Sequence, residues 1–187
     1  IKKETNMSKI NRIVATLGIA AALGIASMPI ATYAAATDSK NVTVKVNVAS
    51  VIALSADSAS TEITMNPNNV NTTGLKTKLT VATNNKNGYK LTVKDVDSTT
   101  AMTSADTTET IPATAGVLTA GTAGWNISGG DLNKVAVTTA DQVVKTNPNT
   151  AHVGIQEDID MVYGVATSAA QAQGTYQDVI IYTATAL

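Results

Sequence analysis

The chain has no cysteine and no phenylalanine, and it contains one tryptophan, one histidine and four prolines among 187 residues. Without cysteine it forms no disulfide, thiolate metal site or thiol nucleophile, and it carries no lipid on an N-terminal cysteine. Its only arginine is Arg12, so no phosphate-binding surface is expected in the rest of the chain. Charged residues make up 14% of the sequence, which argues against a disordered tail, a coiled coil or a nucleic-acid-binding protein.

The first 36 residues have the pattern of an export signal. Met7 is the expected start, and two basic residues precede the uncharged run 13–28. The small residues Ala34–Ala36 then offer a signal peptidase site. We expect cleavage after Ala36, with Ala34 as the second choice. The folded domain is therefore expected to begin after residue 36.

A cleaved signal peptide places the mature chain outside the cell. The alternative to cleavage is that the segment stays on the protein as a membrane anchor. The uncharged run has 16 residues, fewer than the ~20 that a membrane-spanning helix needs, and this favours cleavage. We expect a secreted protein, extracellular or at the cell surface, with residues 37–187 as a single domain. Acidic residues outnumber lysines in this part, so we expect no nucleic-acid partner and no membrane contact after cleavage of the signal.

The mature chain is rich in threonine and valine, which favour strands over helices. Val42, Val44, Val46 and Val48 alternate with polar residues, and this period of two predicts a strand with one apolar face. The apolar run Val51–Leu54 is expected to continue that strand or to begin its partner.

Residues 75–96 show the clearest supersecondary pattern. Apolar and polar residues alternate on both sides of Asn84–Gly88, and its Asn-Gly pair suits a tight turn, so we predict a β-hairpin. Residues 97–131 are dominated by small and polar residues and are expected to form a long loop. Short strands are possible within it near Val117–Leu118 and Trp125–Ile127.

Further strands are expected near Val135–Val137, Val143–Val144, Ile159–Val165 and Val179–Leu187. No window after residue 36 shows a convincing helical stripe. About eight to ten short strands separated by loops predict an all-β fold, an antiparallel β-sandwich of the Ig-like or jelly-roll-like kind.

Three stretches of sequence carry a resemblance to a known family. They are NNKNGYKL over residues 84–91, Val-Tyr-Gly-Val over residues 162–165, and GTYQDVIIYTATAL from Gly174. Together they resemble WxL-type domains of bacterial cell-surface proteins, with a weaker similarity to spore-coat and fimbrial-subunit sandwiches. Tyr89–Leu91 and Tyr182–Ala184 stand where that family has its two Trp-x-Leu motifs. The resemblance implies a sandwich fold, a surface location and non-covalent binding to peptidoglycan.

Trp125 is the main candidate for contact with a ligand. An exposed indole beside Gly124 could stack on a sugar ring, and Tyr89 and Asn126 are the other candidate ligand-binding residues. The alternative is that Trp125 is a core residue that anchors the long loop, because a chain without phenylalanine has few large rings to fill its core. The tyrosines are expected in the core or at a sheet edge.

No catalytic residue, metal site or cofactor is expected. The single histidine, His152, lies in a turn, and no nucleophile motif accompanies it. Asp95–Ser98 resembles the start of a calcium loop, but Thr100 and Asp106 stand where an EF-hand has glycine and glutamate. A looser surface calcium site is the alternative to solvated loop carboxylates.

We therefore expect a non-enzymatic protein of the cell envelope. It would attach without a covalent bond to cell-wall polysaccharide or peptidoglycan, or to other surface proteins. The alternative is a self-assembling fimbrial or coat-type subunit, in which strand 42–48 pairs with the open sheet edge of a neighbour. Pairing of the same strand within its own sheet is the competing expectation, because proteins protect their edges.

Overall fold

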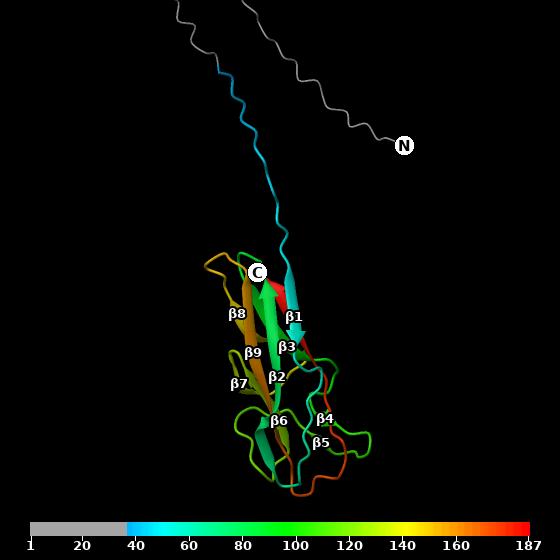
Figure 1. The fold of residues 1–187 in the computed structure, drawn as a ribbon. Helices are drawn as coiled ribbons and strands as arrows, with labels where there is room; N and C mark the ends of the chain where they lie inside the picture. Colours follow the sequence, from blue (N-terminus) through cyan, green and yellow to red (C-terminus); the bar gives the residue numbers. More distant parts are fainter. Residues whose placement is uncertain (1–36) are drawn as a thin grey trace, which may run out of the picture. The chain divides into compact units, whose positions relative to one another are not determined.

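The computed structural model describes residues 37–187, and within them it contains ten β-strands and no helix (Figure 1). The predicted signal peptide and its cleavage position lie outside the described residues. Residues 46–187 form one compact unit. Its strands make a five-stranded and a three-stranded antiparallel sheet around a shared core, with a small two-stranded ribbon beside them. The prediction of an all-β sandwich is confirmed.

The larger sheet has the strand order β1-β2-β9-β6-β7. Its two longest strands, β2 (Val70–Thr83) and β9 (Ile155–Ala166), pair with each other in antiparallel register. On the other side of β9 lies β6 (Gly124–Gly129). The edges of this sheet are β1 (Ile52–Ala56) and β7 (Leu132–Val135).

The smaller sheet has β3 (Tyr89–Asp95) at its centre. Its two edges are β8 (Gln142–Asn147) and β10 (Ile180–Ala186). The remaining strands, β4 (Met102–Thr103) and β5 (Thr110–Ile111), form the ribbon. Because β4, β5 and β6 all fall within residues 97–131, the segment expected to be a long loop is interrupted by strands, and its last part supplies an inner strand of the larger sheet.

Apolar side chains from both sheets meet in one core. Leu79 from β2, Leu91 from β3, Ile127 from β6 and Met161 from β9 are each at most 2% exposed. The alternation of apolar and polar residues in the sequence therefore marks the buried face of these strands, because every second side chain points to the opposite sheet. The strands expected near 135, 143, 159–165 and 179–187 are present as β7 to β10, whereas Val117–Leu118 is not a strand.

The predicted hairpin over residues 75–96 is wrong. β2 belongs to the larger sheet, where β1 and β9 flank it on its two sides, and β3 belongs to the smaller sheet. Asn84–Gly88 carries the chain from one sheet to the other. β2 and β3 lie in different sheets, but both turn an apolar face to the same core. Their apolar and polar residues therefore alternate in the same way as in the two strands of a hairpin. Sequence alternation alone does not separate these two arrangements.

The predicted strand over residues 42–48 is not formed either. Residues 37–51 contain no strand, and the first strand begins at Ile52. Val42, Val44, Val46 and Val48 are 81–83% exposed, although their spacing gives a strand with one apolar face.

Candidate functional site

The candidate ligand residue Trp125 lies in the core. Its side chain is 2% exposed, and its Nε1 donates a hydrogen bond of 2.9 Å to the carbonyl oxygen of Thr100. The indole consequently has no face open to solvent on which a sugar ring could stack. This placement agrees with the alternative interpretation, in which the tryptophan anchors the segment that follows β3.

Tyr89 is also buried, and its hydroxyl group is engaged. It donates a hydrogen bond to Glu157 Oε2, the same oxygen that accepts a hydrogen bond of 2.6 Å from Asn147 Nδ2. Burial, followed by the bond to Glu157 and its charge, raises the pKa of Tyr89 above its ordinary value of 10.0. The hydrogen bonds of Tyr89 and Asn147 to Glu157 connect β3 and β8 of the smaller sheet to β9 of the larger one, so Tyr89 has a structural role.

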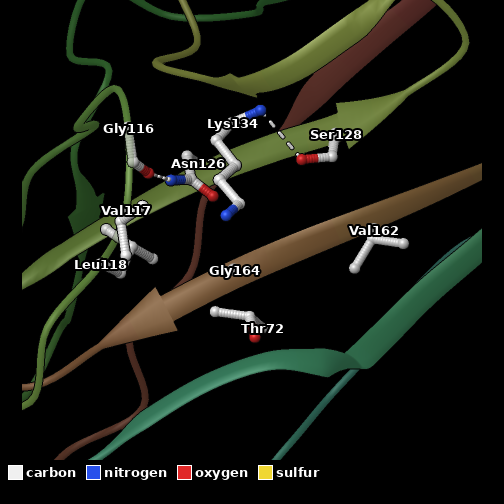
Figure 2. Close-up of a pocket in the computed structure, with 9 residues that line it drawn as sticks. All are labelled: Thr72, Gly116, Val117, Leu118, Asn126, Ser128, Lys134, Val162 and Gly164. Carbon is white, nitrogen blue, oxygen red and sulfur yellow. Dashed lines mark hydrogen bonds between the residues drawn. The ribbon is translucent and has the colours of Figure 1, made fainter.

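Asn126 lies against a small hollow on the outside of the larger sheet (Figure 2). Its Nδ2 donates a hydrogen bond of 2.8 Å to the carbonyl oxygen of Gly116, and the residue is 3% exposed. The hollow has a volume of about 40 Å³, whereas pockets that hold small-molecule ligands begin at about 300 Å³. Its lining consists of Thr72, Gly116, Val117, Leu118, Asn126, Ser128, Lys134, Val162 and Gly164.

A hollow of this size is too small to hold a sugar ring. The three candidate residues are therefore not brought together at an open site. Trp125 and Tyr89 lie in the core, and Asn126 binds the backbone of the loop that passes over β6.

Gly164 permits the packing around Asn126. A Cβ atom at this position would lie 2.7 Å from Asn126 Oδ1 and 3.1 Å from Leu118 Cδ1. We predict that Gly164→Ala lowers the free energy of unfolding by about 1 to 2 kcal/mol, because the amide is held by its bond to Gly116 and has little room to move. Urea unfolding followed by circular dichroism measures the change. An unchanged midpoint would contradict this packing.

The four exposed valines are the most unusual surface feature of the described chain. Isolated apolar side chains on a surface are ordinary, but here four follow one another at every second position over residues 42–48. Thr43, Lys45 and Asn47 lie between them. In an extended conformation the segment has one apolar and one polar face, which is the pattern of a strand that covers the margin of a core.

The sandwich has four edge strands, and two of them carry features that block pairing with another chain. β7 contains Lys134, whose φ of 50° interrupts a regular strand. β8 contains Lys145, which lies 3.6 Å from Asp131, and its pairing with β3 shifts register. Lysines and irregular backbone are common means of preventing edge-to-edge association.

The other two edges, β1 and β10, have no such protection. Their sequences, IALSA and IIYTATA, contain no charged residue, proline or glycine. The two strands contact each other across the same margin of the sandwich. Along this margin Ile52 and Leu54 of β1, and Ile180 and Tyr182 of β10, pack against the core but are only partly buried.

β10 is held in place by strong contacts on its paired side. It pairs with β3 along its whole length, from Ile180 opposite Asp95 to Ala186 opposite Tyr89. The hydroxyl oxygens of Tyr163 and Tyr182 lie 3.0 Å apart and join it to the larger sheet. Burial and the neighbouring Tyr163 raise the pKa of Tyr182 above its ordinary value. The free edge of β10 is therefore a fixed template of seven residues.

One group of side chains in the described part of the chain could hold a metal ion. It consists of Asp95 and Asp97, which belong to the stretch that resembles the start of a calcium loop, and Asp178, which no sequence pattern connects with them. His152 is not part of it. That residue is exposed in a turn with φ 53°, and its Nδ1 lies 2.7 Å from the carbonyl oxygen of Lys86.

Comparison with known proteins gives no family for the chain, because no protein-family model matches it and no curated protein is significantly similar to it. Within residues 37–187, no helix is long and apolar enough to cross a membrane.

Proposed function

We propose that this protein is a non-enzymatic subunit of the cell envelope that joins other copies of itself by strand addition. Residues 42–48 of one copy extend the smaller sheet of the next copy by pairing with the free edge of β10. The observation that carries this proposal is the exposure of four alternating valines in a segment that forms no strand. The predicted export signal and the resemblance to surface domains and fimbrial subunits support a location outside the cell.

The donor segment and the acceptor edge match in length and in chemistry. Residues 42–48 and β10 each have seven residues. A strand added beside β10 would turn its valines toward the half-covered margin formed with β1, and would leave Thr43, Lys45 and Asn47 in water. Each valine that becomes fully buried contributes about 1.5 kcal/mol or more, and pairing of the backbone adds to this.

The geometry of this contact produces open chains of subunits. Each copy has one donor segment and one acceptor edge, and these are different surfaces. Such a heterologous contact leaves one of each free at the two ends of any linear assembly, so growth continues unless a ring closes. The proposed product is therefore a filament or a ladder of oligomers, and its size increases with protein concentration.

Sedimentation velocity over a range of concentrations tests this function. We expect the wild-type protein to form a series of oligomers that persists in 1 M salt, because the contact is mainly apolar. The double variant Val44→Lys, Val46→Lys should weaken the association at least 100-fold, because two apolar side chains that the contact would bury are replaced by charged ones.

The matched control places the same two charges on the other face of the segment. Thr43→Lys with Asn47→Lys should leave association within a few-fold of that of the wild-type protein, because these side chains remain in water. Equal loss in both variants, or monomers at all concentrations, would contradict strand addition. Washed bacterial cell walls form a separate arm, and pelleting that requires the walls would favour attachment to wall polymer instead.

A further inference from the structure

The structure brings three carboxylates together at one end of the smaller sheet. Asp95 ends β3, Asp97 follows two residues later, and Asp178 lies just before β10. One carboxylate oxygen from each residue lies within 4.8 Å of those of the other two. The backbone fixes this arrangement, because Val96 N donates a hydrogen bond of 3.1 Å to the carbonyl oxygen of Val179.

Two of these carboxylates have an oxygen that is buried and receives no hydrogen bond. Asp95 is 3% exposed, and its Oδ2 has no partner, while its Oδ1 accepts a bond of 3.0 Å from Asp97 N. Asp178 Oδ2 is likewise buried without a partner, although Asp178 Oδ1 accepts a bond of 2.6 Å from Val179 N. A buried carboxylate oxygen without a partner destabilises the fold, because its hydration is removed and no hydrogen bond or ion pair replaces it.

Within residues 37–187, no lysine forms an ion pair with a member of the cluster. The ion pairs in the described part of the chain are Lys40–Asp38, Lys78–Asp158, Lys94–Asp141 and Lys145–Asp131, and none of them includes a member of the cluster. Asp95 Oδ2 and Asp178 Oδ2 therefore have neither a hydrogen-bond donor nor an ion-pair partner.

We infer that Asp95, Asp97 and Asp178 bind a calcium ion. A cation among them would supply partners for both unpartnered oxygens and neutralise the repulsion between the three side chains. The donors are all oxygen, which excludes the soft metals that prefer thiolate and imidazole. Calcium accepts irregular sets of oxygen ligands, whereas magnesium requires near-ideal octahedral geometry and retains most of its water.

The site would be of the moderate affinity typical of extracellular modules. Three carboxylates and no preformed loop of regular spacing suggest a Kd on the order of 10⁻⁴ to 10⁻³ M. Bound calcium would connect the end of β3 to the start of β10. This inference rests on the cluster alone and holds whether or not β10 accepts a strand from another copy.

Thermal unfolding of the protein in EDTA and in 10 mM calcium chloride tests the site. We expect calcium to raise the Tm by about 3 to 10 °C, since 10 mM exceeds the expected Kd by about 10- to 100-fold. Magnesium chloride at the same concentration should give a clearly smaller rise. Isothermal titration with calcium chloride measures the Kd directly.

Asp97→Asn is the main variant, because Asp97 is exposed and its replacement leaves the core intact. It should weaken calcium binding at least 10-fold and remove most of the rise in Tm. Asp106→Asn, a change of the same kind at an exposed aspartate outside the cluster, should leave both values unchanged. A full calcium response in Asp97→Asn, or no rise in Tm and no binding in the wild-type protein, would overturn the inference.

Asp178→Asn gives a second, independent result. In EDTA its Tm should be equal to or higher than that of the wild-type protein, because one of three mutually repelling charges has been removed. In calcium it should show little further rise. Retention of the wild-type calcium response by this variant would also overturn the inference.

Discussion

Replacing Trp125 by alanine is expected to lower the free energy of unfolding by about 3 to 5 kcal/mol. The indole is 2% exposed and belongs to the core between the two sheets, so its removal leaves a large cavity. The carbonyl oxygen of Thr100 also loses its hydrogen-bond donor. Urea unfolding followed by circular dichroism measures the loss, because the only tryptophan is no longer available as a fluorescent reporter.

Trp125→Phe separates the two contributions. It keeps most of the ring in the core and removes only the Nε1 donor, so it should cost about 1 to 2 kcal/mol. If Trp125 were an exposed platform for sugars, Trp125→Ala would leave stability unchanged and reduce binding to cell walls. That combination of results would contradict the core position of the indole.

Gly88→Ala is expected to lower the free energy of unfolding by about 3 kcal/mol or more. Gly88 has φ 91°, and a Cβ atom there would lie 1.8 Å from the carbonyl oxygen of Asn147 and 2.7 Å from Asn149 N. Both obstacles are backbone atoms, which cannot rotate away. The crossing from β2 to β3 would therefore have to move relative to β8.

Gly116→Ala is the matched control for this prediction. Gly116 has φ 89°, nearly the same backbone conformation, and a Cβ atom there would meet nothing within 4 Å. It should cost only the backbone strain of about 1 kcal/mol. Equal losses in the two variants would show that strain alone, and not the close approach of Asn147, makes glycine necessary at position 88.

The fold class could be predicted from the sequence because alternation of apolar and polar residues is a local property. Leu79, Leu91 and Ile159 each stand in an alternating run, and each faces the core. Which strands are neighbours is not a local property. β2 pairs with β9, which lies more than 70 residues away in the chain, and nothing within residues 75–96 reveals that partner.

The candidate ligand residues show a second limit of the sequence. The local sequence around an aromatic residue is the same whether its side chain is exposed or buried. Trp125 is covered because its side chain faces the core shared by the two sheets, an arrangement that depends on the whole fold. Asp178 was missed for a similar reason, because only the pairing of Ile180 with Asp95 brings it to the two aspartates that the sequence did single out.

The valine segment is the reverse case. Its alternation predicts a strand, but residues 42–48 form none within the described chain. The pattern and the exposure are compatible if the partner of the strand is another molecule. We therefore interpret residues 42–48 as a strand whose partner is another copy of the chain, and this predicts that the segment becomes protected from solvent only on assembly.

Hydrogen–deuterium exchange at several protein concentrations tests this claim most directly. Strand addition predicts that the amides of residues 42–48, and the β10 amides that point to its free edge, exchange rapidly in dilute solution and slow down together as oligomers form. The β10 amides that point to β3 should be protected at every concentration. Protection of residues 42–48 that is already complete in the monomer would mean that the segment pairs within its own chain. Oligomers in which residues 42–48 still exchange rapidly would contradict the account.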